Sequence, residues 1–216
     1  MQTAPAAALP SLDSAPLPGS RSAEISRETN ETRIHLRLDL DGDGDSNSSL
    51  ATGVGFFDHM LTHIARHGLL SLTIQASGDL QVDDHHTVED VGIVLGEALR
   101  RAVGEKRGMA RYGSATIPMD EALVLCSLDF SGRGGLYCDL TFPDARIGGF
   151  ATELVEEFFR AVAVNAGMTL HLRQLAGRNA HHIAEAAFKA FGRALDAATR
   201  LDPRLAGIIP STKGVL

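Results

Sequence analysis

Alternation of apolar and polar residues marks the first predicted strand, over residues 32–40. Apolar side chains occupy every second position from Ile34 to Leu40, which predicts a strand with one buried face. Residues 23–29 are its predicted hairpin partner. The same alternation returns at residues 70–74 and predicts a further strand of the same kind.

Two helical patterns belong to this first half of the chain. Residues 55–67 form one, and Gly68 is predicted to end it in the usual C-terminal position of a glycine. The second begins at His85 and runs to about Val103, with Asp83 or Asp84 as its predicted N-cap. Its predicted buried stripe contains Val88, Val91, Leu95, Ala98 and Leu99.

The second half repeats this plan. Its strands are predicted at 121–130, 135–142 and 169–175, and its helices at 152–165 and 182–200. The offset between corresponding segments is 98 residues before each middle strand and 96 residues at the two His-His pairs. A repeat on this scale implies two like half-domains, predicted at 23–113 and 114–216. Residues 1–22, rich in Ala, Pro and Ser, are predicted to be a disordered tail.

Charge and composition narrow the possible functions. The net charge of −7 argues against a general nucleic-acid binder. No apolar run approaches the ~20 residues of a membrane span, and no secretory signal is recognisable at the N-terminus. The two cysteines, Cys126 and Cys138, fit a reduced, cytoplasmic compartment better than a disulfide framework.

Two copies of His-His-x-x-Glu carry the most specific chemistry. They are His85-His86-Thr87-Val88-Glu89 and His181-His182-Ile183-Ala184-Glu185. On a helix the first His and the Glu share a face, whereas the second His lies about 100° round. One motif can therefore direct ligands toward two metals. Imidazole and carboxylate without cysteine suit Mn²⁺, Fe²⁺ or Zn²⁺. A purely structural role remains open for one copy alone and is disfavoured by two copies at corresponding places.

Other candidate residues admit two interpretations. His59, His63 and His67 lie four apart on the first helix and form either a row of ligands or a polar face. Arg111 and Arg133 lie in glycine-containing connections that are either solvated loops or anion-binding sites. A metal beside basic residues suggests a small phosphorylated substrate. The sequence contains no Walker loop, complete dinucleotide fingerprint or zinc-protease motif.

Five separated motifs, in order, resemble those of the imidazoleglycerol-phosphate dehydratase family. The resemblance extends from about residue 23 to the C-terminus. The motifs are Gly55-Phe56-Phe57-Asp58-His59-Met60-Leu61, residues 84–90, Ser131-Gly132-Arg133, residues 177–186 and Pro210-Ser211-Thr212-Lys213-Gly214-Val215-Leu216.

The resemblance implies a manganese-dependent hydro-lyase of histidine biosynthesis that converts imidazole glycerol phosphate to imidazole acetol phosphate. It implies an α+β fold of two pseudo-twofold-related half-domains, each a small mixed sheet covered by helices, as in the ribosomal protein S5 domain 2-like duplication. It also implies a homo-oligomer of 24 subunits, with two Mn²⁺ per subunit and active sites between subunits. Neither a nucleic acid nor a membrane is an expected partner.

The resemblance also assigns roles to individual residues. One metal is expected to bind His59, His86, Glu89 and His181, and the other His85, Glu157, His182 and Glu185; the family often has His where this chain has Glu157. Glu31 is the expected proton-transfer group, and Glu89 and Glu185 are the other expected catalytic residues. The expected substrate contacts are Glu31, His59, His63, His67, His85, Glu89, Arg111, Arg133, His181, Lys189, Ser211 and Lys213. Two rivals remain: a metal enzyme for another phosphate ester, and a non-catalytic metal-dependent assembly protein.

Overall fold

The computed structural model describes residues 21–44 and 48–214. Most of the predicted tail, residues 1–20, lies outside the described residues. The last position of that predicted tail, Ser22, is instead the first residue of a strand. No helix within the described residues is long and apolar enough to cross a membrane.

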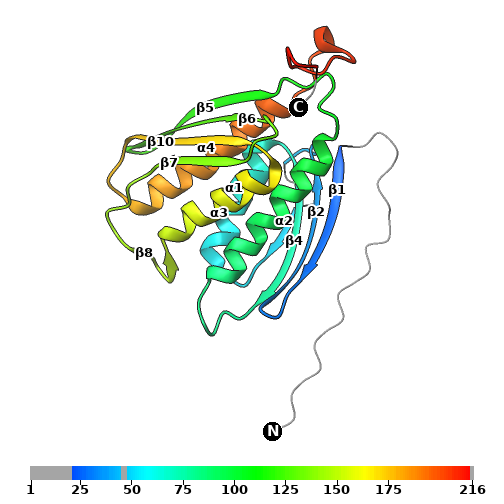
Figure 1. Cartoon of the computed structure of the whole chain (residues 1–216). Helices are drawn as coiled ribbons and strands as arrows, with labels where there is room; N and C mark the ends of the chain where they lie inside the picture. Colours follow the sequence, from blue (N-terminus) through cyan, green and yellow to red (C-terminus); the bar gives the residue numbers. More distant parts are fainter. Residues whose placement is uncertain (1–20, 45–47, 215–216) are drawn as a thin grey trace.

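Two four-stranded sheets have the same topology (Figure 1). In both sheets the first pair and the central pair of strands are antiparallel, and the last pair is parallel. This identity confirms the two-fold plan that the repeat predicted. The first sheet has the order β1-β2-β4-β3, with β1 Ser22–Glu28, β2 Thr32–Asp39, β4 Ser71–Gly78 and β3 Ser49–Ala51. The second has the order β5-β6-β10-β7, with β5 Tyr112–Met119, β6 Ala122–Asp129, β10 Thr169–Ala176 and β7 Gly135–Asp139.

Four helices lie between the two sheets (Figure 1). They are α1 (Gly55–Gly68), α2 (His85–Val103), α3 (Glu153–Ala166) and α4 (Ala180–Thr199). Helix α2 packs on its own sheet and on α3, while α4 packs on its own sheet and on α1. Both helices of each half therefore pack against a helix of the other half. A two-stranded hairpin, β8 (Arg146–Ile147) and β9 (Phe150–Ala151), precedes α3, and a short 3₁₀ turn, η1 (Pro203–Leu205), follows α4.

Glycines set the close approach of both helix pairs. A Cβ on Gly96 of α2 would lie 2.7 Å from the carbonyl oxygen of Val162 on α3. A Cβ on Gly192 of α4, which is 96 residues later, would lie 3.0 Å from the backbone nitrogen of Gly68 on α1. The prediction that Gly68 caps α1 is therefore wrong. The left-handed residue is Leu69, with φ 51°, and Gly68 stays helical where α4 packs closely.

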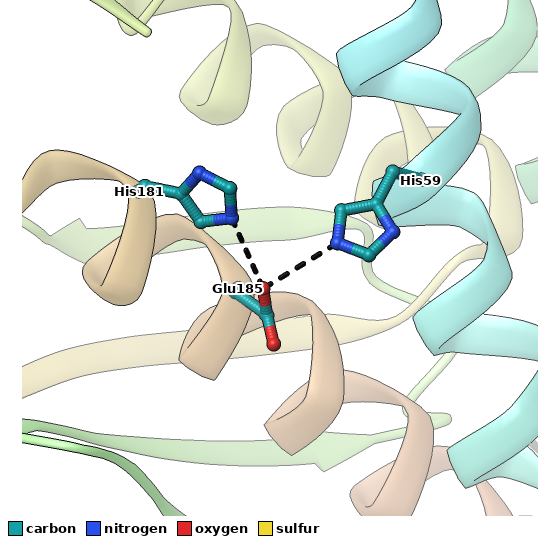
Figure 2. A group of neighbouring side chains, drawn as sticks. All are labelled: His59, His181 and Glu185. Atoms are coloured by element: carbon teal, nitrogen blue, oxygen red, sulfur yellow. Dashed lines mark hydrogen bonds and ion pairs between the residues drawn. The ribbon is translucent and has the colours of Figure 1, made fainter.

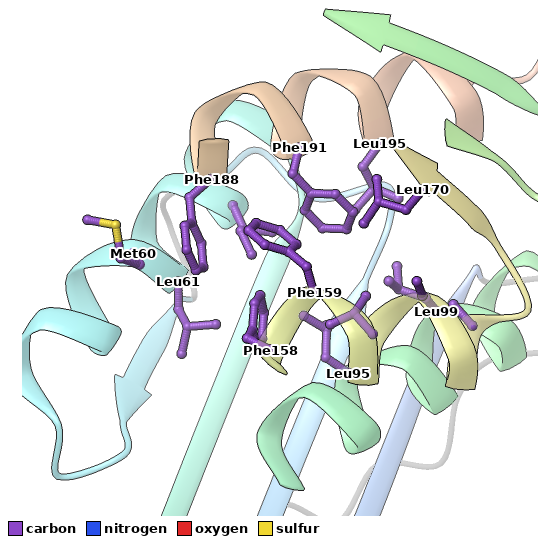
Figure 3. Packing of buried hydrophobic residues seen from close by; sticks show 14 of the residues in the cluster. Met60, Leu61, Leu95, Leu99, Phe158, Phe159, Leu170, Phe188, Phe191 and Leu195 are labelled. Atoms are coloured by element: carbon purple, nitrogen blue, oxygen red, sulfur yellow. The ribbon is translucent and has the colours of Figure 1, made fainter. Parts of the chain in front are cut away.

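The core between the sheets is aromatic at its centre (Figure 3). The rings of Phe158 and Phe188 stack with centroids 5.3 Å apart, and Phe159 contacts both Phe188 and Phe191. All five residues of the predicted stripe of α2 are buried. The aromatic cluster therefore packs α3 against α4.

Strand β5 was not predicted from the sequence. Its alternation is weak, and Gly113 and Pro118 within it are typical of turns. Gly113 is required in the strand because a Cβ there would lie 1.8 Å from the carbonyl oxygen of Ala194 on α4. The sequence also predicted β7 too long, since the strand ends at Asp139.

Candidate active site

Helices α1 and α4 bring together His59, His181 and Glu185 (Figure 2). Nε2 of His181 lies 3.1 Å from Oε2 of Glu185, and Nε2 of His59 lies 3.5 Å from the same oxygen. One ligand atom from each residue lies within 4.8 Å of the other two. Three good ligands for a divalent metal therefore converge on one point from the two halves of the chain.

The N-terminus of α4 positions two members of this group. The side chain of Asn179 accepts hydrogen bonds from the backbone N–H groups of His181, at 2.9 Å, and His182, at 3.3 Å. This cap starts the helix at Ala180, so His181 and Glu185 lie one turn apart on the same face. His59 reaches them because α1 packs closely on α4 at Gly68 and Gly192.

Glu185 divides its two oxygens between different neighbours. While Oε2 faces the two histidines, Oε1 lies 2.6 Å from Nζ of Lys189 and 3.5 Å from Nε2 of His63. Burial raises the pKa of Glu185, but the hydrogen bond from Lys189 and the neighbouring positive charges lower it to about 2. The side chain is only 8% exposed, so the site holds a buried carboxylate that is anionic at neutral pH.

The histidines one and two turns along α1 have lowered pKa values. Burial lowers the pKa of His63 to about 4, against the opposing charge of Glu185. Burial and the charge of Lys189 also lower the pKa of His67. His63 is therefore neutral at pH 7, and its Nε2 lies 3.3 Å from Nε2 of His59. His63 therefore lies within the site, beside His59 and Glu185, whereas a ligand role for the whole row of histidines stays a prediction.

The first His-His-x-x-Glu motif begins α2, as predicted. The N-cap is Asp84, which makes no side-chain cap bond, and Oδ1 of Asp83 accepts from the backbone N–H of His85 at 2.9 Å. Nε2 of His85 lies 3.9 Å from Oε2 of Glu89. Glu157 lies on α3, which packs on α2 as α1 packs on α4. By the repeat, Glu157 takes the place of His59.

The second histidine of each motif has a carboxylate on its Nδ1. Nδ1 of His86 lies 3.0 Å from Oδ2 of Asp79, and Nδ1 of His182 lies 2.7 Å from Oε2 of Glu121. The hydrogen bond to His182 is the largest cause that lowers the pKa of Glu121 to about 2. Sequence reasoning missed both carboxylates. The repeat offered one signal, because Glu121 stands directly before β6 as Glu31 stands before β2.

The expected division of ligands between two metals differs from the arrangement in the chain. Glu185 was grouped with His85, Glu157 and His182, yet it lies beside His59 and His181. The reason is helical geometry, since the first His and the Glu of one motif share a face. Within the described residues, His59, His181 and Glu185 are the only group of three potential ligands that lies this close together.

The two predicted anion-binding arginines have different surroundings. The guanidinium of Arg111 forms two hydrogen bonds with Asp129, at 2.7 and 3.1 Å, and donates to the carbonyl oxygen of Pro210 at 2.8 Å. Arg111 thus fixes the C-terminal segment in which Ser211 accepts from the backbone of Lys213. Within the described residues, the guanidinium of Arg133 donates only to the carbonyl oxygen of Ser131, at 3.4 Å. The arrangement leaves Arg133 better able to bind an anion.

Comparison with known proteins decides the family. The family model described as imidazoleglycerol-phosphate dehydratase matches residues 52–195, which include both His-His-x-x-Glu motifs. The chain belongs to the imidazoleglycerol-phosphate dehydratase family. The resemblance noted from five motifs is confirmed, as is the prediction that the chain is an enzyme of this kind.

Relatives of this name match nearly their whole length. The imidazoleglycerol-phosphate dehydratase of Desulforamulus reducens is 60% identical over 197 residues, which cover 91% of this chain and 99% of that protein. That of Acidiphilium cryptum is 59% identical over 197 residues, 91% of this chain and 100% of that protein.

Solved structures of the family share the fold. The crystal structure of the Staphylococcus aureus enzyme has a TM-score of 0.76 and 42% identity, and covers 84% of this chain and 99% of that one. The Pyrococcus furiosus structure, in complex with (S)-C348, has a TM-score of 0.77 and 41% identity, and covers 89% and 100%. The predicted α+β class with two like half-domains is confirmed.

Proposed function

We propose that this chain dehydrates imidazole glycerol phosphate to imidazole acetol phosphate in histidine biosynthesis, with two Mn²⁺ per subunit. The observation that carries the proposal is the convergence of His59, His181 and Glu185 in a chain of this family. Family membership supports the reaction, while the cluster supports the metal. The two free cysteines fit a cytoplasmic location.

The donor set fits a divalent metal of intermediate softness. The cluster offers two imidazole nitrogens and one anionic carboxylate oxygen, without a thiolate, which suits Mn²⁺. The repeat supplies a second set from His85, Glu89 and Glu157, which offers one imidazole and two carboxylates. A bound metal would supply Lewis-acid polarisation and would stabilise negative charge that develops on the substrate.

The remaining histidines support sites that are shared between subunits. His86 and His182 point away from the face that carries the first His and the Glu of their own motif, because each is about 100° round its helix. Their ring nitrogens face carboxylates of their own half, and neither joins the cluster of three. We propose that each completes a metal site of a neighbouring copy, within a homo-oligomer of 24 subunits.

Glu31 is the group best placed for proton transfer. Its side chain is 53% exposed and lies 3.9 Å from Nδ1 of His86, beyond hydrogen-bond range. A carboxylate that is close to the metal-binding residues and is not itself a ligand can accept or donate a proton to a bound substrate. The proposed phosphate contacts are Arg133, Ser211 and Lys213. Lys189 instead forms an ion pair with Glu185.

The decisive experiment compares metal-free and Mn²⁺-loaded protein. Imidazole glycerol phosphate should be converted only by the loaded protein, and glycerol phosphate, which lacks the ring, should be left unchanged. Chelation should stop turnover and release smaller species, because ligands from two subunits would no longer be joined. An assembled, Mn²⁺-loaded protein without turnover would support a non-catalytic assembly protein instead, and turnover of another phosphate ester alone would support a different enzyme.

A further inference from the structure

Both second histidines are held by carboxylates from outside their own helix. Asp79 follows β4 and holds Nδ1 of His86 at 3.0 Å. Glu121 precedes β6 and holds Nδ1 of His182 at 2.7 Å. The two carboxylates come from different places in the two halves, so the repeat alone does not explain why both histidines have such a partner.

Glu121 is fixed by three hydrogen bonds. Its Oε1 accepts from the backbone N–H groups of Asn179, at 2.8 Å, and Arg178, at 3.2 Å. Its Oε2 accepts from Nδ1 of His182. Because both oxygens have partners, the carboxylate is held in one orientation at the start of α4. Nε2 of His182 is left facing outward, 3.7 Å from the exposed carboxylate of Asp120.

The position of Asp79 has no carboxylate in the second half. The corresponding residue, 98 positions later, is Gly177, with φ 134°. A Cβ there would lie 2.9 Å from the side chains of Ala122 and Ile183. Both the backbone conformation and the available space exclude a side chain at this position. The second half must therefore hold its histidine in another way.

Glu31 and Glu121 occupy corresponding places and have different partners. Each directly precedes the second strand of its sheet, 90 residues apart. Glu121 bonds its histidine directly, whereas Glu31 lies 3.9 Å from His86 because Asp79 already occupies that Nδ1. In the first half, Asp79 therefore makes the contact with the second histidine that Glu121 makes in the second half.

We propose that Asp79 and Glu121 are positioning residues that keep the hydrogen of His86 and His182 on Nδ1 and present each Nε2 to a metal. A carboxylate on the non-ligating nitrogen fixes the tautomer and the direction of a metal-binding imidazole. By occupying His86, Asp79 also leaves Glu31 available for the proton transfer. This inference rests on the proposed metal site, since it requires His86 and His182 to be ligands.

Glu121→Gln separates positioning from a structural role. The glutamine oxygen keeps the two backbone N–H bonds, which turns its NH₂ group toward Nδ1 of His182. That nitrogen can accept only when the ring hydrogen lies on Nε2, and in this tautomer Nε2 cannot bind a metal. Glu121→Ala removes the carboxylate and leaves the ring free to take either tautomer.

The experiment titrates Mn²⁺ into metal-free protein and follows the free ion by electron paramagnetic resonance. Glu121→Gln should weaken Mn²⁺ binding roughly 10- to 100-fold, at least as much as Glu121→Ala, while its metal-free unfolding temperature stays near that of the wild type. Asp79→Ala should also weaken binding at His86, because the ring loses the carboxylate on its Nδ1. The control is Glu105→Gln, an exposed glutamate paired with Arg107, and it should bind Mn²⁺ normally.

Three results would overturn the proposal in distinguishable ways. Normal Mn²⁺ affinity in both Glu121→Gln and Asp79→Ala would show that the tautomer is not controlled by these carboxylates. Normal affinity and stability in Glu121→Gln, with both lost in Glu121→Ala, would assign Glu121 a structural role only. Failure of the wild type itself to bind Mn²⁺ would overturn the proposed metal site together with this inference.

Discussion

Glu185 and Lys189 form a 2.6 Å ion pair that uses only one oxygen of the carboxylate. The other oxygen faces His59 and His181. Lys189 therefore holds Glu185 in the orientation that completes the ligand cluster. Lys189 lies one helical turn after Glu185, so α4 itself supplies the partner that stabilises this ligand.

Glu185→Gln and Glu89→Gln should each remove a metal together with turnover. A neutral amide is a weaker ligand than the carboxylate that it replaces. If the two motifs serve two metals, each variant should retain about half of the Mn²⁺ of the wild type, measured by elemental analysis of dialysed protein. Full metal content with lost turnover would show that these glutamates are not ligands.

Glu31→Gln should lower kcat on the order of 10²-fold or more, as expected for loss of a general acid or base. Metal content and particle size should stay unchanged, because Glu31 belongs to neither ligand set. Steady-state kinetics and metal analysis on one preparation would show this. Glu28→Gln is the matched control, since Glu28 ends β1 nearby and pairs with Arg33 on the surface. A normal kcat in Glu31→Gln would return the proton transfer to another group.

Arg133→Ala and Arg111→Ala should have different effects. Loss of Arg133 should raise KM through a lost phosphate contact, by an amount on the order of 1.5 to 3 kcal/mol, and should leave stability unchanged. Loss of Arg111 should also lower the free energy of unfolding, on the order of 1 to 3 kcal/mol, because Asp129 and the Pro210 carbonyl lose their donor. Chemical denaturation and kinetics of both variants would test this. Equal stability of the two variants would contradict the structural role of Arg111.

Removal of residues 1–20 should leave assembly and turnover intact, whereas a truncation that starts at Ala23 should lower stability. The two truncations differ by Arg21 and by Ser22, the first residue of β1. Arg21 pairs with Asp41 and donates to the carbonyl oxygen of Thr199 at the end of α4. The first sheet and α4 would lose this connection. Thermal unfolding of both truncations and of Arg21→Ala would decide. Equal stability of the two truncations would show that Arg21 contributes nothing.

Local patterns in the sequence predicted most of the fold, because each strand and helix carries its own periodicity. The histidine motifs begin α2 and α4 as expected, since capping residues directly precede them. Strand β5 was missed because its Gly113 is required by α4, which lies far along the chain. The same is true of Gly68, whose helical conformation is explained only by the approach of Gly192.

The sequence predicted which residues belong to the site better than it predicted which of them lie together. Spacing alone paired His181 with Glu185, and the structure agrees. The partner of His182 lies 61 residues away, on the turn before β6, and no local pattern identifies it. Comparison of the two halves would have found Glu121, because it stands where Glu31 stands. The sequence could not show that Glu121 bonds to His182 whereas Glu31 makes no hydrogen bond with His86.

An anomalous diffraction measurement at the manganese absorption edge, on crystals of the Mn²⁺-loaded protein, tests the two-metal site most directly. We expect one manganese peak between His59, His181 and Glu185, and a second between His85, Glu89 and Glu157. We also expect Nε2 of His182 or His86 from a neighbouring copy to complete each site. Manganese bound elsewhere in an active protein, or a single peak with full activity, would contradict the two-metal site.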